Sequence, residues 1–304
     1  MTGAVTWARL TFRLQRSSIA FAALVCLGLA GTAAWLAVNL PSRTVSLLGS
    51  PLGEPVMLTQ LVIGVAMYAV PLVLGVPILA QEVEHRTAMI AWPLAGSRLK
   101  WLSWRAGSVI VIGLVLIGIM AVAAEVLASA EAPDSELGFL SHGSRGISLI
   151  MRSILTLVVA LALGAVIGRL LPSLLIGVAF AVVISTAVGS LVPFGVEPTE
   201  ITPTAVTPTE AFYEGGPPLQ TGHSYRAPDG TPISDDEAEA MSMAVFAEYS
   251  PELPPDSELP QDVVHGIDGS RYFEVLARES AVLGGVTILA AGVAAAVVQR
   301  RRPE

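Results

Sequence analysis

The chain has 304 residues, of which 53% are hydrophobic and only 14% are charged, and its formal net charge is −8. Soluble domains usually carry about 25% charged residues, so the composition indicates an integral membrane protein and excludes an ordinary soluble domain. The one cysteine, Cys26, lies in an apolar stretch, and no disulfide within the chain is possible.

Long segments without charged residues locate the membrane spans. A helix needs about 20 apolar residues to cross the hydrocarbon core. The segments are continuously apolar and do not alternate, which indicates helices and not a barrel. The sequence therefore predicts an all-α membrane protein with six transmembrane helices, at about residues 18–40, 57–80, 106–128, 147–169, 173–194 and 278–299.

The basic residues predict the orientation. Most arginines, and the single lysine, Lys100, fall near the termini and in the connections that follow the second and fourth spans. Basic residues in short loops mark the cytoplasmic side, so both termini are expected there. The N-terminal residues 7–16 space three arginines as on an amphipathic helix lying on the membrane surface, although a charged flank that only sets topology explains them equally well.

Residues 195–275 form the one large hydrophilic region, which is acidic and rich in proline. We expect it to be an extracytoplasmic cap inserted between the fifth and sixth helices. Its first part, 197–210, repeats Pro and Thr and is expected to be extended and irregular. Ser234 and Glu237 form a capping box that predicts a short helix near 235–249. The predicted domains are the membrane domain 1–194, the cap 195–275, and the sixth helix with a basic tail, 276–304.

No motif for catalysis is present. Lys100 follows leucine and not glycine, so the chain has no phosphate-binding Walker lysine. The histidines are scattered singly, and no zinc or serine-hydrolase motif occurs. We expect no catalytic residue, no metal site and no cofactor in this chain.

Charged residues inside the predicted spans are candidates for a functional site. Glu125 and Arg152 lie toward the outer ends of the third and fourth helices, and Arg278 and Glu279 open the sixth. A Glu125–Arg152 pair that lines a central path is one interpretation. The alternative is that these side chains, within about two turns of the interface, extend to water.

The segment from Glu82 to Arg105 joins the second and third spans and is charged and rich in tryptophan. Its first part, Ala80 to Pro93, is predicted to form a short helix along the inner surface, with Trp101 and Trp104 as interfacial anchors. The segment resembles the ABC-2 type permease family, the membrane subunits of ABC exporters. The matching positions are Glu82, Glu84, Thr87, Ala91-Trp92, Ser97-Arg98 and Lys100-Trp101-Leu102.

Two positions depart from the family pattern. Arg86 stands where the family usually has a small residue, and the outer insertion is longer than in compact members. In the family, this segment contacts a separate ATPase subunit. The resemblance therefore implies that Glu82, Glu84, Thr87 and Arg98 couple the chain to an ATPase, although an interfacial connector without a partner is the alternative.

The resemblance implies the permease subunit of an ATP-driven exporter in a bacterial cell membrane. Its partners would be a dimer of cytosolic ATPase subunits, which bind ATP and Mg, a second permease chain of the same or a sister kind, and membrane lipid, but no nucleic acid. The substrate would be an amphipathic, drug-like or lipid-like molecule. The alternatives are a receptor or immunity-type protein that acts through its outer cap, and a secondary transporter.

Overall fold

The computed structural model describes residues 12–40, 52–85, 97–131, 137–191, 194–201, 205–206, 211–212, 215–249 and 259–300. The chain divides into two compact units. Unit 1 comprises Met1–Pro133, Ser141–Val192 and Leu276–Glu304, and unit 2 comprises Asp134–Leu140 and Pro193–Val275.

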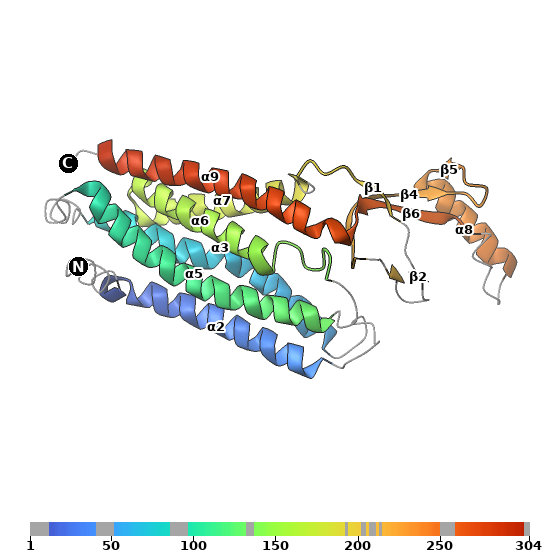
Figure 1. Cartoon of the computed structure of the whole chain (residues 1–304), viewed down its shortest axis with the longest axis horizontal. Helices are drawn as coiled ribbons and strands as arrows, with labels where there is room; N and C mark the ends of the chain where they lie inside the picture. The colour runs from blue at the N-terminus through green and yellow to red at the C-terminus, as the bar shows by residue number, and fades with distance from the viewer. Residues whose placement is uncertain are drawn as a thin grey trace. The chain divides into compact units, whose positions relative to one another are not determined.

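The described part of unit 1 contains six helices that are each long and apolar enough to cross a membrane (Figure 1). The predicted all-α membrane protein with six transmembrane helices is confirmed, and every helix begins before its predicted start. The helices are α2 (Arg16–Asn39), α3 (Gly53–Glu84), α5 (Arg98–Glu131), α6 (Gly146–Ile167), α7 (Leu170–Leu191) and α9 (Tyr272–Arg300).

Helix α3 forms the centre of the bundle and packs against α2, α5, α6 and α7. It contains Pro71 and Pro77, both buried, and continues through them to Glu84. Each proline removes one backbone N–H from the helix ladder, and close packing on neighbouring helices compensates for this loss.

The contact between α3 and α6 depends on glycine. A Cβ at Gly75 would lie 2.7 Å from Ala160 Cβ, and a Cβ at Gly164 would lie 2.9 Å from the Val76 carbonyl oxygen. Small residues let two helix backbones approach closely, which is how helices associate where lipid is the solvent. The pair α3–α6 is therefore a tightly packed frame for the rest of unit 1.

Successive helices run in opposite directions, so the bundle has two ends. We call the basic end the one where α3, α6 and α9 finish and α2, α5 and α7 begin, since Arg16, Arg98, Arg169 and Arg300 lie there. The opposite end is called the far end. Of the predicted amphipathic helix at 7–16, residues 7–11 lie outside the described residues, and residues 12–14 are helical.

Unit 2 contains an antiparallel four-stranded sheet with the order β1-β6-β4-β5. The sequence did not predict this sheet, because its strands carry polar residues and glycine and lack a simple alternation. A separate short pair, β2 (Ala205–Val206) with β3 (Ala211–Phe212), falls where an irregular segment was expected. The strands of the main sheet are β1 (Thr199–Ile201), β4 (Leu219–Arg226), β5 (Pro232–Ile233) and β6 (Gln261–Ile267).

The predicted short helix is confirmed as α8 (Asp235–Tyr249). The Glu237 carboxylate accepts hydrogen bonds from the Ser234 backbone N–H and hydroxyl at 2.9 Å, and the Glu237 N–H donates to Ser234 Oγ at 3.3 Å. This reciprocal pattern is a capping box. The hydrogen bonds from the Ser234 backbone and side chain hold the pKa of the Glu237 carboxyl below its usual range.

Candidate functional sites

The connection between α3 and α5 was predicted to begin with a surface helix at Ala80. In the structure, residues 80–84 are instead the last part of α3, and Ala80 is fully buried. Thr87 and Trp92 lie outside the described residues. Three of the four predicted coupling residues, Glu82, Glu84 and Arg98, can therefore be placed.

Glu82 forms an ion pair with Arg105 of α5. Only 13% of the Glu82 side chain and 3% of the Arg105 side chain are exposed. Because a buried charge that loses its partner is strongly unfavourable, this pair fixes the end of α3 against the first turns of α5. Glu82 thus points into unit 1 and offers little surface to another protein.

Glu84 lies two residues further along α3 and is exposed. Its Oε2 accepts a hydrogen bond of 2.9 Å from the backbone N–H of Leu170, the first residue of α7. The first N–H groups of a helix have no partner within it, and a negative charge at that end also suits the helix dipole. Glu84 therefore ties the end of α3 to the start of α7.

Arg98, the first residue of α5, contacts the last turn of α9. Its Nη1 donates a hydrogen bond of 3.0 Å to the Gln299 carbonyl oxygen, a group that the helix itself leaves without a donor. A positive charge at a helix C-terminus is favourable. Glu82, Glu84 and Arg98 thus bind three different helices, α5, α7 and α9, from the two ends of one connection.

The two tryptophans near the start of α5 differ in their surroundings. Trp104 is 40% exposed, as a residue at a membrane interface would be. Trp101 is only 1% exposed and belongs to the hydrophobic core. The predicted role of Trp101 as an interfacial anchor was wrong, because its ring faces the neighbouring helices and not lipid.

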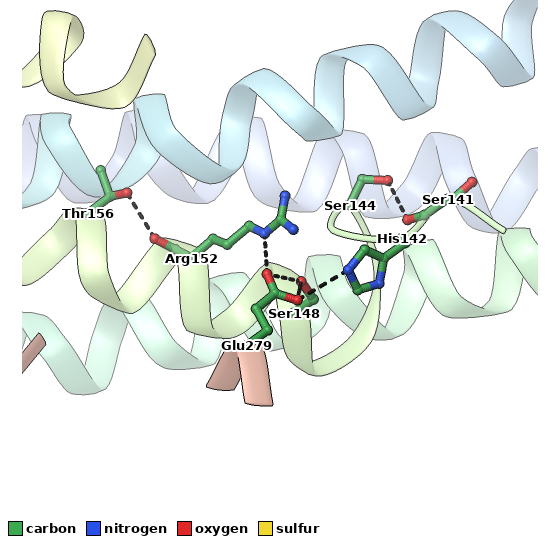
Figure 2. Close-up of polar contacts among 7 residues, drawn as sticks. All are labelled: Ser141, His142, Ser144, Ser148, Arg152, Thr156 and Glu279. Carbon is green, nitrogen blue, oxygen red and sulfur yellow. Dashed lines mark hydrogen bonds and ion pairs between the residues drawn. The ribbon is translucent and has the colours of Figure 1, made fainter. Parts of the chain in front are cut away.

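A second polar site lies toward the far end, where the Glu279 carboxylate of α9 is fully buried (Figure 2). Arg152 Nε donates to Glu279 Oε1 at 2.7 Å, and Ser148 Oγ lies 2.9 Å from both carboxylate oxygens. His142 Nε2 lies 3.2 Å from Oε2. Ser148 and Arg152 are one turn apart on α6 and face the same way, so α6 and its preceding loop surround the carboxylate of α9.

The loop before α6 gives this cluster its shape. Ser144 donates from its backbone N–H and its hydroxyl to the Ser141 carbonyl oxygen, which closes a tight turn around His142. Gly143 has a φ of +87°, and a Cβ there would overlap the Arg152 guanidinium. Only glycine leaves room for the arginine in this backbone conformation.

The predicted pairing of Glu125 with Arg152 was wrong. Arg152 binds Glu279, while Glu125 Oε1 accepts a hydrogen bond of 2.6 Å from Arg145 Nη1. The sequence shows the charge at Glu279, but it does not show that α6 and α9 are neighbours. The detectable signal was the similar depth of Arg152 and Glu279, each about two turns inside its helix.

Unit 2 has a serine close to a histidine, with Ser224 Oγ 2.7 Å from His265 Nε2 on neighbouring strands. Glu200 is opposite His265 in the sheet, but its carboxylate pairs with Arg226 at 2.5 Å. An acid that orients the histidine is the third part of a hydrolase triad, and here that acid is engaged elsewhere. The pair is best understood as a cross-strand hydrogen bond. In the described parts of both units, no three His, Cys, Asp or Glu side chains gather as metal ligands would.

Comparison with known protein families gives a match over the membrane helices. The model of the family described as "ABC-2 membrane transporter related" matches residues 18–192, which reach from α2 to α7. No curated protein and no solved structure matches the chain. The matched region covers more than half of the 304 residues and includes the connection from α3 to α5. The chain therefore belongs to the ABC-2 membrane transporter related family.

Proposed function

We propose that this protein is the membrane-spanning subunit of an ATP-driven exporter, which moves an amphipathic, drug-like or lipid-like molecule out of a bacterial cell. Membership of the family supports a multi-pass transport component that associates with an ATPase subunit and is generally not an enzyme itself. ATP and Mg would be bound by that subunit. The basic end would face the cytoplasm, with both termini there, and unit 2 would lie outside the cell.

The observation that carries the proposal is the set of contacts around the connection from α3 to α5. Glu82 and Glu84 at its start, and Arg98 at its end, bind α5, α7 and α9. A force applied to residues 86–96 by a partner would therefore reach three other helices through charged side chains. Such a connection is suited to passing a conformational change from a soluble subunit to the membrane helices.

The contacts divide the predicted coupling residues by role. Glu82 is largely buried and paired, so it is suited to transmission within the chain. Glu84 is exposed and borders residues 86–96. Glu84 is therefore a better candidate than Glu82 for direct contact with the ATPase, Arg98 would pass the movement to α9, and Thr87 lies outside the described residues.

Co-purification of the tagged full-length chain from gently solubilised bacterial membranes tests the proposal. The wild type, Glu84→Ala with Thr87→Ala, and a control variant, Glu54→Ala, at the other end of α3 are compared. We expect a soluble ATPase at a fixed ratio with the wild type and the control, and a weaker association with the double variant, whose stability falls by no more than the loss of one exposed hydrogen bond, about 1 kcal/mol. The recovered complex is then reconstituted into vesicles with its cytoplasmic side outward, and ATP-dependent transport into the vesicles is measured.

Three outcomes would contradict the proposal. If no ATPase co-purifies in several mild detergents and in nanodiscs, the coupling role of the connection is wrong. An activity that persists without any ATPase, but is lost when unit 2 is removed, would favour a receptor-type protein. An activity driven by an ion gradient alone would favour a secondary transporter.

A further inference from the structure

Helix α9 is held very unevenly along its length. Near the far end, Glu279 is fully buried and is bound by Arg152, Ser148 and His142. Between Leu283 and Ala294 no residue of the helix is buried. At the basic end, α9 is attached through small buried side chains, Ala294 and Val298, and through the hydrogen bond from Arg98.

The surroundings of α9 also differ between its two ends. Toward the far end, Gly284 lies against Met151 of α6, whose Cε would be 3.7 Å from a Cβ at that position. At the basic end, an open hollow of about 340 Å³ lies on the surface beside the last turns of α6 and α9. Its walls are Val166 on one helix and Ala296, Val297 and Arg300 on the other. At its basic end α9 therefore borders an open hollow beside the packed Ala294 and Val298, whereas Glu279 is enclosed.

We propose that α9 pivots about the buried Glu279 cluster, and that Arg98 moves its basic end as the connection from α3 to α5 responds to the ATPase. This inference rests on the proposed function. The helix swings toward and away from α6 across the hollow, so opening and closing of the bundle beside α9 follows the state of the partner subunit. His142, Ser148 and Arg152 are positioning residues for this movement and not a substrate site.

A buried carboxylate is a suitable pivot. It cannot leave its partners without exposing an unpaired charge to an apolar interior, so its position is fixed. The contacts from Arg152, Ser148 and His142 all meet at the Glu279 carboxylate. A small rotation of α9 about this point therefore changes their lengths little. The middle of α9 presents no buried large side chain to a neighbour, so it has no interlocking surface that would resist the rotation.

Chemical cross-linking between α6 and α9 tests the pivot in the full complex with its ATPase. The native Cys26 is replaced by alanine, and two cysteine pairs are compared with a bifunctional thiol reagent. The first pair, Val166→Cys with Val297→Cys, spans the hollow. The second, Met151→Cys with Gly284→Cys, lies next to Glu279.

We expect the cross-linking rate of the Val166/Val297 pair to change about fivefold or more between the nucleotide-free complex and the complex with a non-hydrolysable ATP analogue. The rate of the Met151/Gly284 pair should stay the same. In Glu279→Gln, which keeps the shape but removes the charge, the second pair should also become sensitive to nucleotide. Glu274→Gln, on the same helix in a partly exposed ion pair with Arg271, is the matched control and should behave as the wild type.

The failures of the two proposals can be told apart. If the ATPase binds and hydrolyses ATP but neither pair responds, or both respond equally, the pivot is wrong while the transport function stands. If no ATPase is recovered, the proposed function fails first. A Glu279→Gln variant that cross-links and transports as the wild type does would also overturn the pivot.

Discussion

Glu82→Gln separates a structural role for Glu82 from a docking role. The substitution keeps the size of the side chain but removes its charge, and it leaves the Arg105 guanidinium, 3% exposed, without a compensating carboxylate. If Glu82 served only to contact an ATPase at the surface, the isolated chain would be unaffected. Because Glu82 is paired inside unit 1, we expect the isolated chain to lose stability.

The size of the effect follows from burial. Removing one partner of a buried ion pair costs about 3–5 kcal/mol, mainly because the remaining charge is left unpaired. Arg105 lies two turns from the start of α5, and part of its side chain can reach toward water in the variant. We therefore expect about 3 kcal/mol, at the lower end of that range.

Thermal unfolding in detergent, followed by the loss of monodisperse protein, measures this difference. The matched control is Glu84→Gln, on the same turn of α3, because glutamine keeps an oxygen that can accept the hydrogen bond from Leu170. Its free energy of unfolding should stay within about 0.5 kcal/mol of the wild-type value, which is the usual range for surface substitutions. Glu82→Gln combined with Arg105→Met removes both charges and should recover most of the loss.

Equal melting temperatures for Glu82→Gln and Glu84→Gln would refute the reasoning, since they would mean that both carboxylates are solvated. A double variant no more stable than Glu82→Gln alone would also refute it, because the cost would then not come from the unpaired arginine.

Three further results are expected, two from thermal melting and one from hydrogen exchange. Gly75→Ala should destabilise unit 1 by about 1–3 kcal/mol, since its Cβ would lie 2.9 Å from a backbone oxygen of α6, whereas Gly64→Ala, with no atom within 4 Å, should be neutral or slightly stabilising in the same melting assay. In unit 2, the capping box of α8 contributes stability above the unfolded pKa of the Glu237 carboxyl, and this is lost as the pH falls through its lower folded pKa. Amide protection in α8, corrected for intrinsic exchange, should fall over that range in the wild type but not in Glu237→Gln. Arg226→Met breaks an exposed pair with Glu200 and should change the melting temperature of unit 2 by less than the equivalent of about 1 kcal/mol.

The spans were predictable from sequence because a membrane imposes a length and a composition on every helix that crosses it. The capping box at Ser234 was predictable because its geometry is complete within four residues. The sheet of unit 2 was not, since β1 and β6 are more than fifty residues apart and their pairing depends on contacts that no local pattern records. The polar strand β4 also lacks the alternation that marks a half-buried strand.

The far-end cluster shows the same limit for a functional site. Arg152 and Glu125 lie on consecutive spans, so the sequence favoured a bond between them. The partner that the structure gives to Arg152 is Glu279, 127 residues away, because α9 lies against α6. Charge and depth predicted that these side chains need partners, but which partner each one binds is decided by the order of helices around α3.

Charged contacts between helices occupy the two ends of unit 1, while its interior is filled by apolar side chains such as Leu74, Ile117 and Leu157, with glycine where α3 meets α6. At the basic end they are Glu82 with Arg105, Glu84 with Leu170, and Arg98 with Gln299. A charge near a helix end can be paired at modest cost, whereas one at mid-depth is far more expensive. The directional bonds that define which helices move together are therefore confined to the ends. Between them, the glycine contact of α3 with α6 makes a close-packed frame, and the proposed pivot has α9 turn against it.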